Sequence, residues 1–220
     1  MIKAIVFDFD GLIFDTETHE YRVLEEIYKS HGAELPLEVW GQCVGTHANF
    51  FDAYAYLEQC IGKPVDRDVL GKQRREMFDL RVENETALPG VENYLVAAKR
   101  LGLKIGLASS SNRAWVTRWL TKLNLLDYFE CIRTADDVEH VKPDPALYLK
   151  ACECLGVQPQ EAIAFEDSPN GAIAAKRAGM HCVIVPNFVT TTLTFGEHDL
   201  RLNSMAEMEL EKVIERLERK

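Results

Sequence analysis

The sequence predicts an α/β fold with an all-helical insertion, and two patterns lead to this prediction. Short apolar segments alternate with segments of helical periodicity after residue 86, which is typical of a doubly wound parallel sheet covered by helices. Between residues 16 and 85, helical patterns follow one another with no strand between them. We therefore expect a Rossmann-like α/β core of residues 1–15 and 86–220, with a helical cap domain formed by residues 16–85.

The individual elements follow from local patterns. Residues 2–9 form a continuous apolar run rich in branched side chains, which predicts a strand buried on both faces. Helical periodicity in the insertion covers residues 19–30, 36–43, 48–61 and 66–82. After the turn Leu88-Pro89-Gly90 we expect strands at 104–108, 129–133, 162–165 and 182–185 and helices at 91–101, 114–123, 146–155, 171–178 and 205–217.

The composition is that of a globular chain and excludes several classes of partner. Of the 220 residues, 47 % are hydrophobic and 27 % are charged, which rules out disorder, collagen and coiled coil as global descriptions. The formal net charge of −10 repels nucleic acid phosphates and anionic lipid, so neither is expected as a main partner. No segment reaches the roughly 18 apolar residues of a membrane span, and acids at positions 8 and 10 are unlike a secretory signal. A cytoplasmic protein is expected.

The six cysteines, at positions 43, 60, 131, 152, 154 and 182, are scattered along the chain. In a cytoplasmic protein we expect all of them to be reduced thiols without a special role. Cys152 and Cys154 fall in a helical pattern, where their side chains diverge by about 200°, and this is poor geometry for one metal ion.

Polar side chains follow the predicted strands. Asp8 and Asp10 come after the first strand and, being two residues apart in extended chain, can point into one site. Gly11 then permits a sharp turn. Ser109 and Ser110 follow the second strand, Lys142 precedes the helix at 146, and Glu166 and Asp167 end the strand at 162.

Each of these segments alone has an ordinary explanation, such as a helix N-cap at Ser109 or a surface lysine at Lys142. However, right-handed crossovers bring the carboxyl ends of parallel strands to one edge of the sheet, where ligands bind. The combination of carboxylates, hydroxyls and a lysine at that edge suits phosphoryl transfer. Carboxylates hold Mg²⁺, and the metal ion and Lys142 neutralise phosphate oxygens. One aspartate can attack phosphorus while the other donates a proton to the leaving alcohol.

Residues 8–16 read Asp-Phe-Asp-Gly-Leu-Ile-Phe-Asp-Thr and resemble the D-x-D-G-x-x-x-D-[ST] signature of the haloacid dehalogenase-like phosphatases. Residues 107–111, 142–145 and 165–171 are similar to the other three motifs of that superfamily, in the same order. The resemblance covers residues 2–185 and is strongest to the β-phosphoglucomutases and small sugar-phosphate phosphatases. In that subgroup a helical cap follows the first motif, where residues 16–85 lie here.

The resemblance implies a role for each motif residue. Asp8 would be the nucleophile that forms an aspartyl phosphate, and Asp10 the general acid and then the base that activates water. The phosphoryl group would be bound by Ser109, Ser110 and Lys142. Mg²⁺ would be held by Asp8, the backbone carbonyl of Asp10 and Asp167, with Glu166 binding directly or through water. Halide removal is not expected, because true dehalogenases of the superfamily lack the second aspartate.

Three functional alternatives remain at this point. Hydrolysis of a small-molecule phosphate ester by a monomeric phosphatase is favoured, because Glu20 and Ala48 stand where the mutases carry His and Arg. A mutase must hold a second phosphate, which Arg113 or Lys72 could still serve. A non-catalytic binding protein is the third alternative, although it would be expected to have lost one of the charged motif residues.

Substrate choice should depend on the cap and on the rim of the core. The residues expected to contact substrate there are Glu17, His47, Asn112 and Arg113. Residues 13–17 and 84–88 are the expected hinges between the core and the cap.

Overall fold

The computed structural model describes residues 1–41 and 51–219. Its centre is a six-stranded sheet in the order β3-β2-β1-β4-β5-β6, and every neighbouring pair is parallel. The predicted doubly wound sheet is therefore confirmed. The strands are β1 (Ala4–Phe7), β2 (Lys104–Ala108), β3 (Cys131–Arg133), β4 (Ala162–Glu166), β5 (His181–Ile184) and β6 (Leu200–Arg201). The two-residue strand β6 has no pattern in the sequence that predicts it.

Five helices accompany the sheet and agree with the predicted segments to within a few residues. They are α5 (Val91–Arg100), α6 (Arg113–Lys122), α7 (Ala146–Leu155), α8 (Pro169–Arg177) and α9 (Leu210–Glu218). The predicted helix at 205–217 is divided into a 3₁₀ turn, Met205–Glu207, and α9, because Met208 and Glu209 are extended. Helix α8 begins earlier than predicted, since Ser168 caps it by accepting the backbone N–H of Gly171 at 3.1 Å.

The two faces of the sheet bury side chains of different size. Small residues of β1 and β4, such as Ala4 and Ala164, lie in the hydrophobic cluster with α7 and α8. Larger residues that alternate with them, such as Phe7 and Phe165, lie in the cluster with α5, α6 and α9. Burial on both faces explains why the strands are continuous apolar runs in the sequence.

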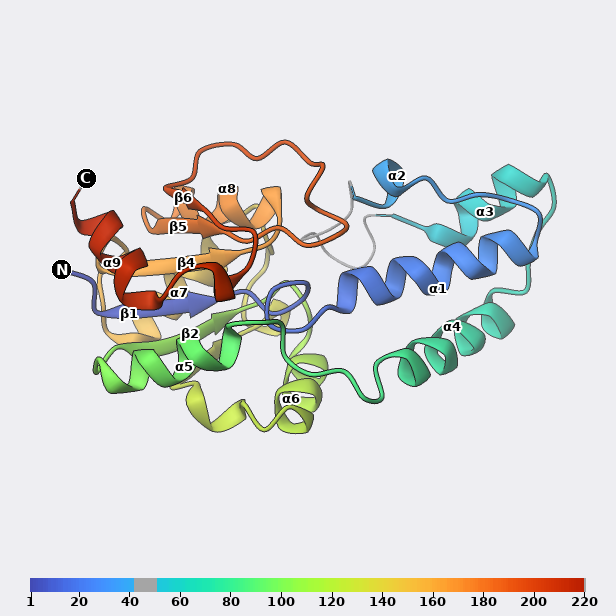
Figure 1. Cartoon of the computed structure of the whole chain (residues 1–220). Coiled ribbons are helices and arrows are strands. Elements are labelled where there is room, and N and C mark those ends of the chain that lie inside the picture. Colours follow the sequence, from blue (N-terminus) through green and yellow to red (C-terminus); the bar gives the residue numbers. More distant parts are fainter. Residues whose placement is uncertain (42–50, 220) are drawn as a thin grey trace.

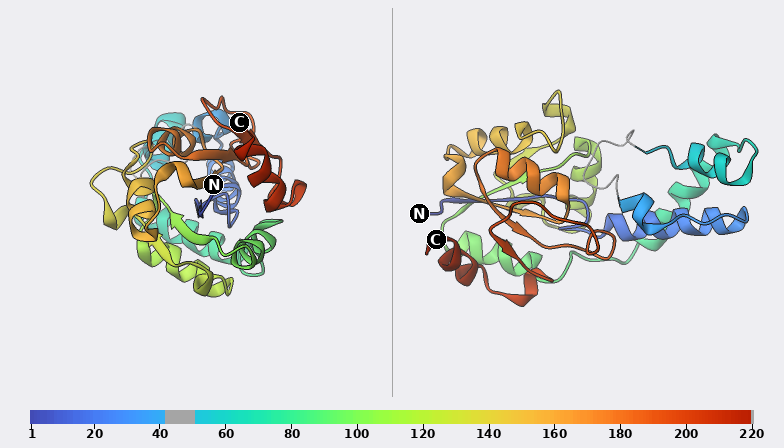
Figure 2. Two further views of the ribbon diagram at one scale, coloured as in Figure 1. Left: turned by 90° about the vertical axis from the view of Figure 1, so that its left-hand side faces the viewer. Right: turned by 90° about the horizontal axis from the view of Figure 1, so that it is seen from above.

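The described residues between 16 and 85, a segment that we call the helical insertion, lie beyond the carboxyl ends of the strands (Figure 1). Its helices are α1 (Thr16–Ser30), α2 (Leu37–Gly41), α3 (Ala53–Ile61) and α4 (Arg67–Arg81). Helix α3 begins later than predicted, because the Asp52 side chain accepts the backbone N–H groups of Tyr54 and Ala55 and so caps the helix. The views in Figure 2 place both chain termini at the opposite end of the sheet from the insertion.

The two connections between the sheet and the insertion contact each other. The backbone N–H of Leu88 donates a hydrogen bond of 2.8 Å to the carbonyl of Ile13. Asp15 ends the first connection by accepting the backbone N–H of Thr18 at 3.1 Å, which caps α1. The chain thus leaves and re-enters the core at one place.

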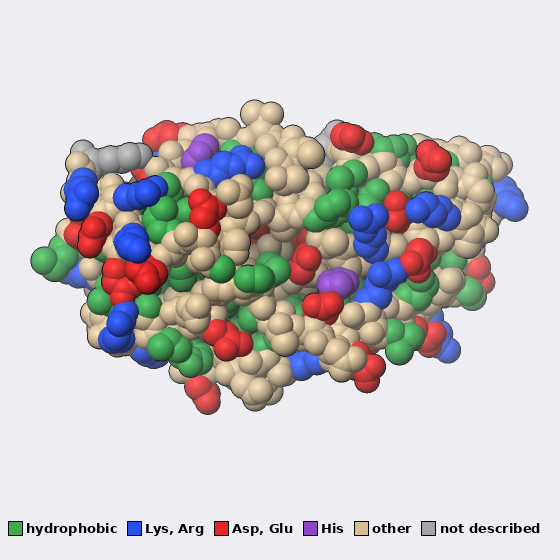
Figure 3. Space-filling model, viewed as in Figure 1, with side chains coloured by type: hydrophobic (Ala, Val, Ile, Leu, Met, Phe, Trp, Pro, Cys, Tyr) green, Lys and Arg blue, Asp and Glu red, His purple; other side chains and the backbone are tan. Residues whose placement is uncertain are grey.

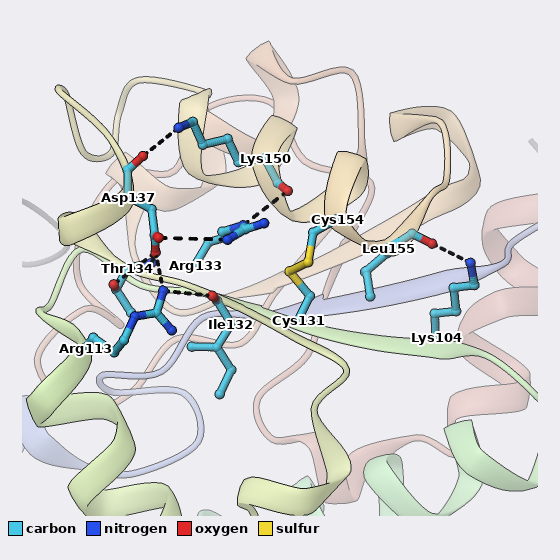
Figure 4. The surroundings of a disulfide bond; sticks show 10 residues. All are labelled: Lys104, Arg113, Cys131, Ile132, Arg133, Thr134, Asp137, Lys150, Cys154 and Leu155. Atoms are coloured by element: carbon cyan, nitrogen blue, oxygen red, sulfur yellow. Dashed lines mark hydrogen bonds and ion pairs between the residues drawn. A yellow bond between two sulfur atoms is a disulfide. The ribbon is translucent and has the colours of Figure 1, made fainter.

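One prediction about the cysteines is wrong. Cys131 of β3 and Cys154 of α7 form a disulfide with their Cα atoms 6.2 Å apart (Figure 4). Helix α7 packs on β2 and β3, which brings together two cysteines that are 23 residues apart in the sequence. Sequence spacing contains no sign of this contact. Cys60, Cys152 and Cys182 are free thiols, and of these only Cys60 is exposed.

Over the described part of the chain, no helix combines the length and the apolar character needed to cross a membrane.

Candidate active site

Four charged side chains lie together at the carboxyl edge of the sheet. Asp8 directly follows β1, Glu166 is the last residue of β4, and Asp167 comes next. Since β1 pairs in parallel with β4 through Phe7 and Phe165, these acids reach the same level of the sheet. Lys142 comes from the segment between β3 and α7. All four residues are at most 7 % exposed.

Lys142 connects two of the acids. Its ammonium group donates hydrogen bonds to Asp8 Oδ1 and, at 2.6 Å, to Glu166 Oε1. Burial alone would lower the pKa of Lys142, but the charges of Asp8 and Glu166 outweigh burial and hold the pKa above its ordinary value. Lys142 is therefore a permanent cation, and its pairing makes the burial of the charge possible.

The carboxylates outnumber the cation that neutralises them. Oxygen atoms of Asp8, Glu166 and Asp167 all lie within 4.8 Å of one another. Burial, together with the charges of Glu166 and Asp10, raises the pKa of Asp8 to about 8 in spite of Lys142. Burial and the neighbouring carboxylates Asp8 and Glu166 also raise the pKa of Asp167 well above its ordinary value. Three clustered acids and one ammonium group leave an excess of negative charge, which fits a divalent cation that prefers oxygen ligands.

Both oxygens of Glu166 are already engaged. Oε1 accepts hydrogen bonds from Lys142 and, at 2.5 Å, from the hydroxyl of Tyr148, while Oε2 accepts the hydroxyl of Ser168 at 3.2 Å. The carboxylate fills the space over Gly171, where a Cβ would lie 1.9 Å from it. This packing fixes the Glu166 side chain and excludes any residue larger than glycine at position 171.

The Asp10 carboxylate lies apart from this cluster and is held by four donors. Oδ1 accepts the indole N–H of Trp115 at 2.8 Å and the hydroxyl of Thr16 at 2.9 Å. Oδ2 accepts the hydroxyl of Ser111 at 2.6 Å and, over a longer distance of 3.4 Å, that of Ser109. The side chain is thereby fixed between the first strand end, the insertion and the start of α6.

The loop after β2 supplies the two predicted phosphate-binding serines. Ser109 is fully buried, and its backbone N–H donates to the carbonyl of Arg133 at 2.9 Å. Its Oγ accepts the backbone N–H of Ser111 at 3.0 Å, which tightens the turn before α6. Ser110 lies at the head of this turn and is half-buried.

The residues predicted to contact substrate lie at different places relative to the acidic cluster. Glu17 lies beside Asp10 and Glu20, and burial followed by these charges raises its pKa well above the ordinary value. Asn112 caps α6 by accepting the backbone N–H of Trp115 at 2.9 Å. Arg113 pairs with Asp137 at 2.6 Å and donates to the carbonyl of Ile132 at 3.2 Å (Figure 4). Among the described residues of this set, Glu17 is the one whose pKa is raised by burial and by the charges of Asp10 and Asp8.

His47, which is predicted to contact substrate, and Ala48, which stands where the mutases carry Arg, lie outside the described residues. Lys72, which could have served a distal anion, is exposed and lies 3.8 Å from Glu76 on the same helix. Arg74 donates to Glu20 at 2.7 Å. Lys72 and Arg74 therefore each have a carboxylate nearby.

Sequence analysis overlooked several residues that contact the site. Trp115 and Ser111 bind Asp10, Tyr148 binds Glu166, and Asn187 donates its amide to Asp167 Oδ2 at 2.7 Å. Asn187 could have been found, because it follows the strand predicted at 182–185 in the way that Asp8 and Ser109 follow theirs. Trp115 has no such signal, since an aromatic residue in a helix is usually part of the core.

The fold and the site together define a parallel-sheet hydrolase with an acidic centre. The chain belongs to the haloacid dehalogenase-like hydrolase family, whose sequence profile matches residues 5–185.

Its relatives extend over nearly the whole chain. A protein of Bacillus subtilis (strain 168) with the name "Putative phosphatase YhcW" is 61 % identical over 99 % of this chain and 98 % of its own length. Hexitol phosphatase B of Escherichia coli (strain K12) is 31 % identical over 94 % of each chain. The crystal structure of CbbY from Rhodobacter sphaeroides in complex with phosphate is similar with a TM-score of 0.74. It is 29 % identical and covers 94 % of this chain and 96 % of its own.

Proposed function

We propose that this protein is a metal-dependent phosphatase that hydrolyses a small phosphate monoester through an aspartyl-phosphate intermediate. The observation that carries the proposal is the buried group of Asp8, Lys142 and Asp167, with Asp10 held separately at its side. A nucleophile and an acid of the same residue type are thus placed in two different environments, as the two steps of the reaction require. The phosphatase names of the two relatives agree with this assignment.

The chemical steps follow from the two aspartates. Asp8 attacks phosphorus, and the bond to the leaving oxygen breaks as Asp10 gives that oxygen a proton. Asp10, now a carboxylate, then takes a proton from the water that attacks phosphorus, which releases inorganic phosphate and restores Asp8. Lys142 offsets the negative charge of Asp8 as it approaches an anionic ester. Ser109 and Ser110 would bind the remaining phosphate oxygens.

The acidic cluster fits Mg²⁺, a hard cation with oxygen ligands. We assign Asp8, Asp167 and the backbone carbonyl of Asp10 as its protein ligands. Glu166 would contribute through water, because both of its oxygens already accept hydrogen bonds from protein groups. When bound, the ion would neutralise phosphate oxygens and part of the excess negative charge.

The surroundings of Glu17 favour a substrate with hydroxyl groups and a single phosphate. Glu17, Glu20 and Asp15 are acidic residues at the junction of core and insertion, and their oxygen atoms suit the hydroxyl groups of a substrate better than a second phosphate. Arg74 is already paired with Glu20. These contacts support a sugar or polyol monophosphate over the bisphosphate that a β-phosphoglucomutase-type mutase must bind.

We further propose that the helical insertion of residues 16–85 acts as a cap over the core of residues 1–15 and 86–220. Closure would exclude water during phosphoryl transfer to Asp8 and opening would admit it afterwards. Figure 3 shows acidic and basic side chains interspersed over one face of both parts, which agrees with a small-molecule substrate and not a nucleic acid. A monomeric state and a cytoplasmic location stay predictions from the sequence.

Phosphate release from a panel of monoesters, including p-nitrophenyl phosphate and sorbitol 6-phosphate, tests the proposal. We expect Mg²⁺-dependent release by the wild type, no turnover by Asp8→Asn, and a rate lowered by roughly 10²–10⁴ for Asp10→Asn. Near-normal hydrolysis by Asp8→Asn would contradict the nucleophile assignment. Conversion of glucose 1-phosphate to glucose 6-phosphate without phosphate release would instead identify a mutase. A folded chain inactive on every ester would support the non-catalytic alternative.

A further inference from the structure

The indole ring of Trp115 contacts the core site and the helical insertion at the same time. Its Nε1–H donates a 2.8 Å hydrogen bond to Asp10 Oδ1. The centre of its ring lies 5.6 Å from that of Phe78, a residue of α4 that is only 3 % exposed. A single side chain of α6 thus connects the carboxylate of Asp10 with a buried aromatic residue of the insertion.

The hydrogen bonds of Asp10 divide its two oxygens between two environments. Oδ1 is held by Trp115 and Thr16. Oδ2 consequently lies on the side of Ser111 and Ser109, where the phosphoryl group would bind. A general acid must present its proton within hydrogen-bonding reach of the leaving oxygen, so the orientation of this carboxylate matters as much as its presence.

We propose that Trp115 is a positioning residue for Asp10 and that contact with Phe78 of the insertion holds it in place. Its indole N–H fixes Oδ1 and thereby directs Oδ2 toward the leaving group. Because Phe78 belongs to the insertion, the acid is correctly oriented only when α4 is docked against α6. The inference rests on the proposed function, since it takes Asp10 to be the general acid.

The variant Trp115→Phe removes the N–H donor and keeps an aromatic ring against Phe78. Trp119→Phe is a matched control from the next turn of α6. The Trp119 ring also packs on Phe78, with centroids 6.0 Å apart, but its Nε1 has no hydrogen-bond partner in the described structure. Both variants replace a tryptophan ring of the aromatic cluster around Phe78, but only Trp115→Phe removes a hydrogen-bond donor to Asp10.

A comparison of two aryl phosphates of similar size distinguishes a misplaced general acid from a general loss of active-site structure. The 4-nitrophenolate of p-nitrophenyl phosphate leaves readily without a proton, whereas the more basic phenolate of 4-methylphenyl phosphate depends on the acid. The ratio kcat/KM reports the steps up to phosphoryl transfer. For Trp115→Phe we expect kcat/KM to fall about tenfold on the 4-methylphenyl ester and about twofold on the 4-nitrophenyl ester. Trp119→Phe should change both esters equally.

An equal loss on both esters, or no loss, in Trp115→Phe would overturn the inference while leaving the proposed function intact. Phe78→Ala should reproduce the selective loss, and an unselective effect would refute the part assigned to the insertion. A folded wild type that hydrolyses neither ester would refute the proposed function and this inference with it.

A measurement without turnover tests the hydrogen bond itself. In ¹H–¹⁵N spectra, Asp10→Ala should shift the indole N–H signal of Trp115 and leave those of Trp40 and Trp119 nearly unchanged. An unmoved Trp115 signal would contradict the contact on which the inference depends.

Discussion

The side-chain amide of Asn187 donates a hydrogen bond of 2.7 Å to Asp167 Oδ2. The same nitrogen donates to the carbonyl of Gly11 at 3.1 Å, and the amide oxygen accepts the backbone N–H of Val189 at 2.9 Å. These contacts fix which end of the amide faces Asp167. They also require glycine at position 11, because its φ is +79° and a Cβ there would lie 2.4 Å from the Asn187 nitrogen.

Replacement of Asn187 by Ala should weaken metal binding. Asp167 would lose the donor that orients its carboxylate, and loss of such a partner typically lowers metal affinity by about 10–100-fold. Calorimetric titration with Mg²⁺ measures the change directly. Asn203→Ala is a suitable control, because among the described residues the Asn203 amide bonds to Glu207, in an exposed loop away from Asp167. An unchanged affinity in Asn187→Ala would show that Asp167 needs no such support.

Lys142→Met should destabilise the protein strongly, and more at pH 9 than at pH 7. Removal of the cation leaves Asp8 and Glu166 buried without it, and breaking a buried pair costs about 3–5 kcal/mol of unfolding free energy. The pKa of Asp8 is about 8 with Lys142 present, and loss of Lys142 raises it further. Above pH 8 the wild type therefore holds an ionised, paired Asp8, whereas the variant continues to lose stability as the pH rises toward its own higher pKa. Urea unfolding in EDTA at the two pH values measures the effect. The exposed Lys150→Met serves as control, and an equal loss at both pH values would contradict the explanation.

Glu17→Gln should stabilise the protein above neutral pH. The folded state raises the pKa of Glu17 well above its ordinary value of 4.5, so it favours the protonated form. A raised carboxyl pKa contributes stability below the unfolded pKa, and this contribution is lost as the pH rises through the folded value. The variant, which resembles the protonated form, should therefore have a higher Tm than the wild type at pH 8, and the difference should vanish below pH 4.5. Exposed Glu153→Gln should show no such trend.

Cys154→Ser should lower the free energy of unfolding under oxidising conditions. The Cys131–Cys154 bond closes a loop of 23 residues, which corresponds to about 3 kcal/mol of lost unfolded-state entropy. The loop carries Lys142, so thermal inactivation should also become faster. Denaturation with and without a thiol reductant measures both effects. Reductant should shift the wild type toward the variant and leave the variant unchanged, and the exposed Cys60→Ser should behave as the wild type.

The sheet was predictable from the sequence because its strands are buried on both faces and alternate with helices. The strand ends were predictable for the same reason, and they led to Asp8, Asp10, Lys142 and Asp167. Strand β6 was not predictable, since two residues are too short for any periodicity. The Cys131–Cys154 disulfide depends on how α7 packs on the sheet, which no local pattern records.

The partners of the site residues were harder to foresee. Trp115 lies in an amphipathic helix and resembles a core residue until the direction of its N–H is known. The same holds for Arg113: its charge and position predict contact with substrate, and its ion pair with Asp137 has no signal in the sequence. In both cases the side chain's direction decides the role, and direction comes from tertiary packing.

The hydrogen bond between Leu88 and Ile13 brings the first and last residues of the connections to the helical insertion close together. The chain passes between the sheet and the insertion at this one place, so the register of β1 against β2 does not depend on how many residues lie beyond it. The entropic cost of closing an inserted segment rises only slowly with the length of the segment. A different segment could therefore replace this one and change the range of accepted esters, while the sheet and the residues at its carboxyl edge stay the same.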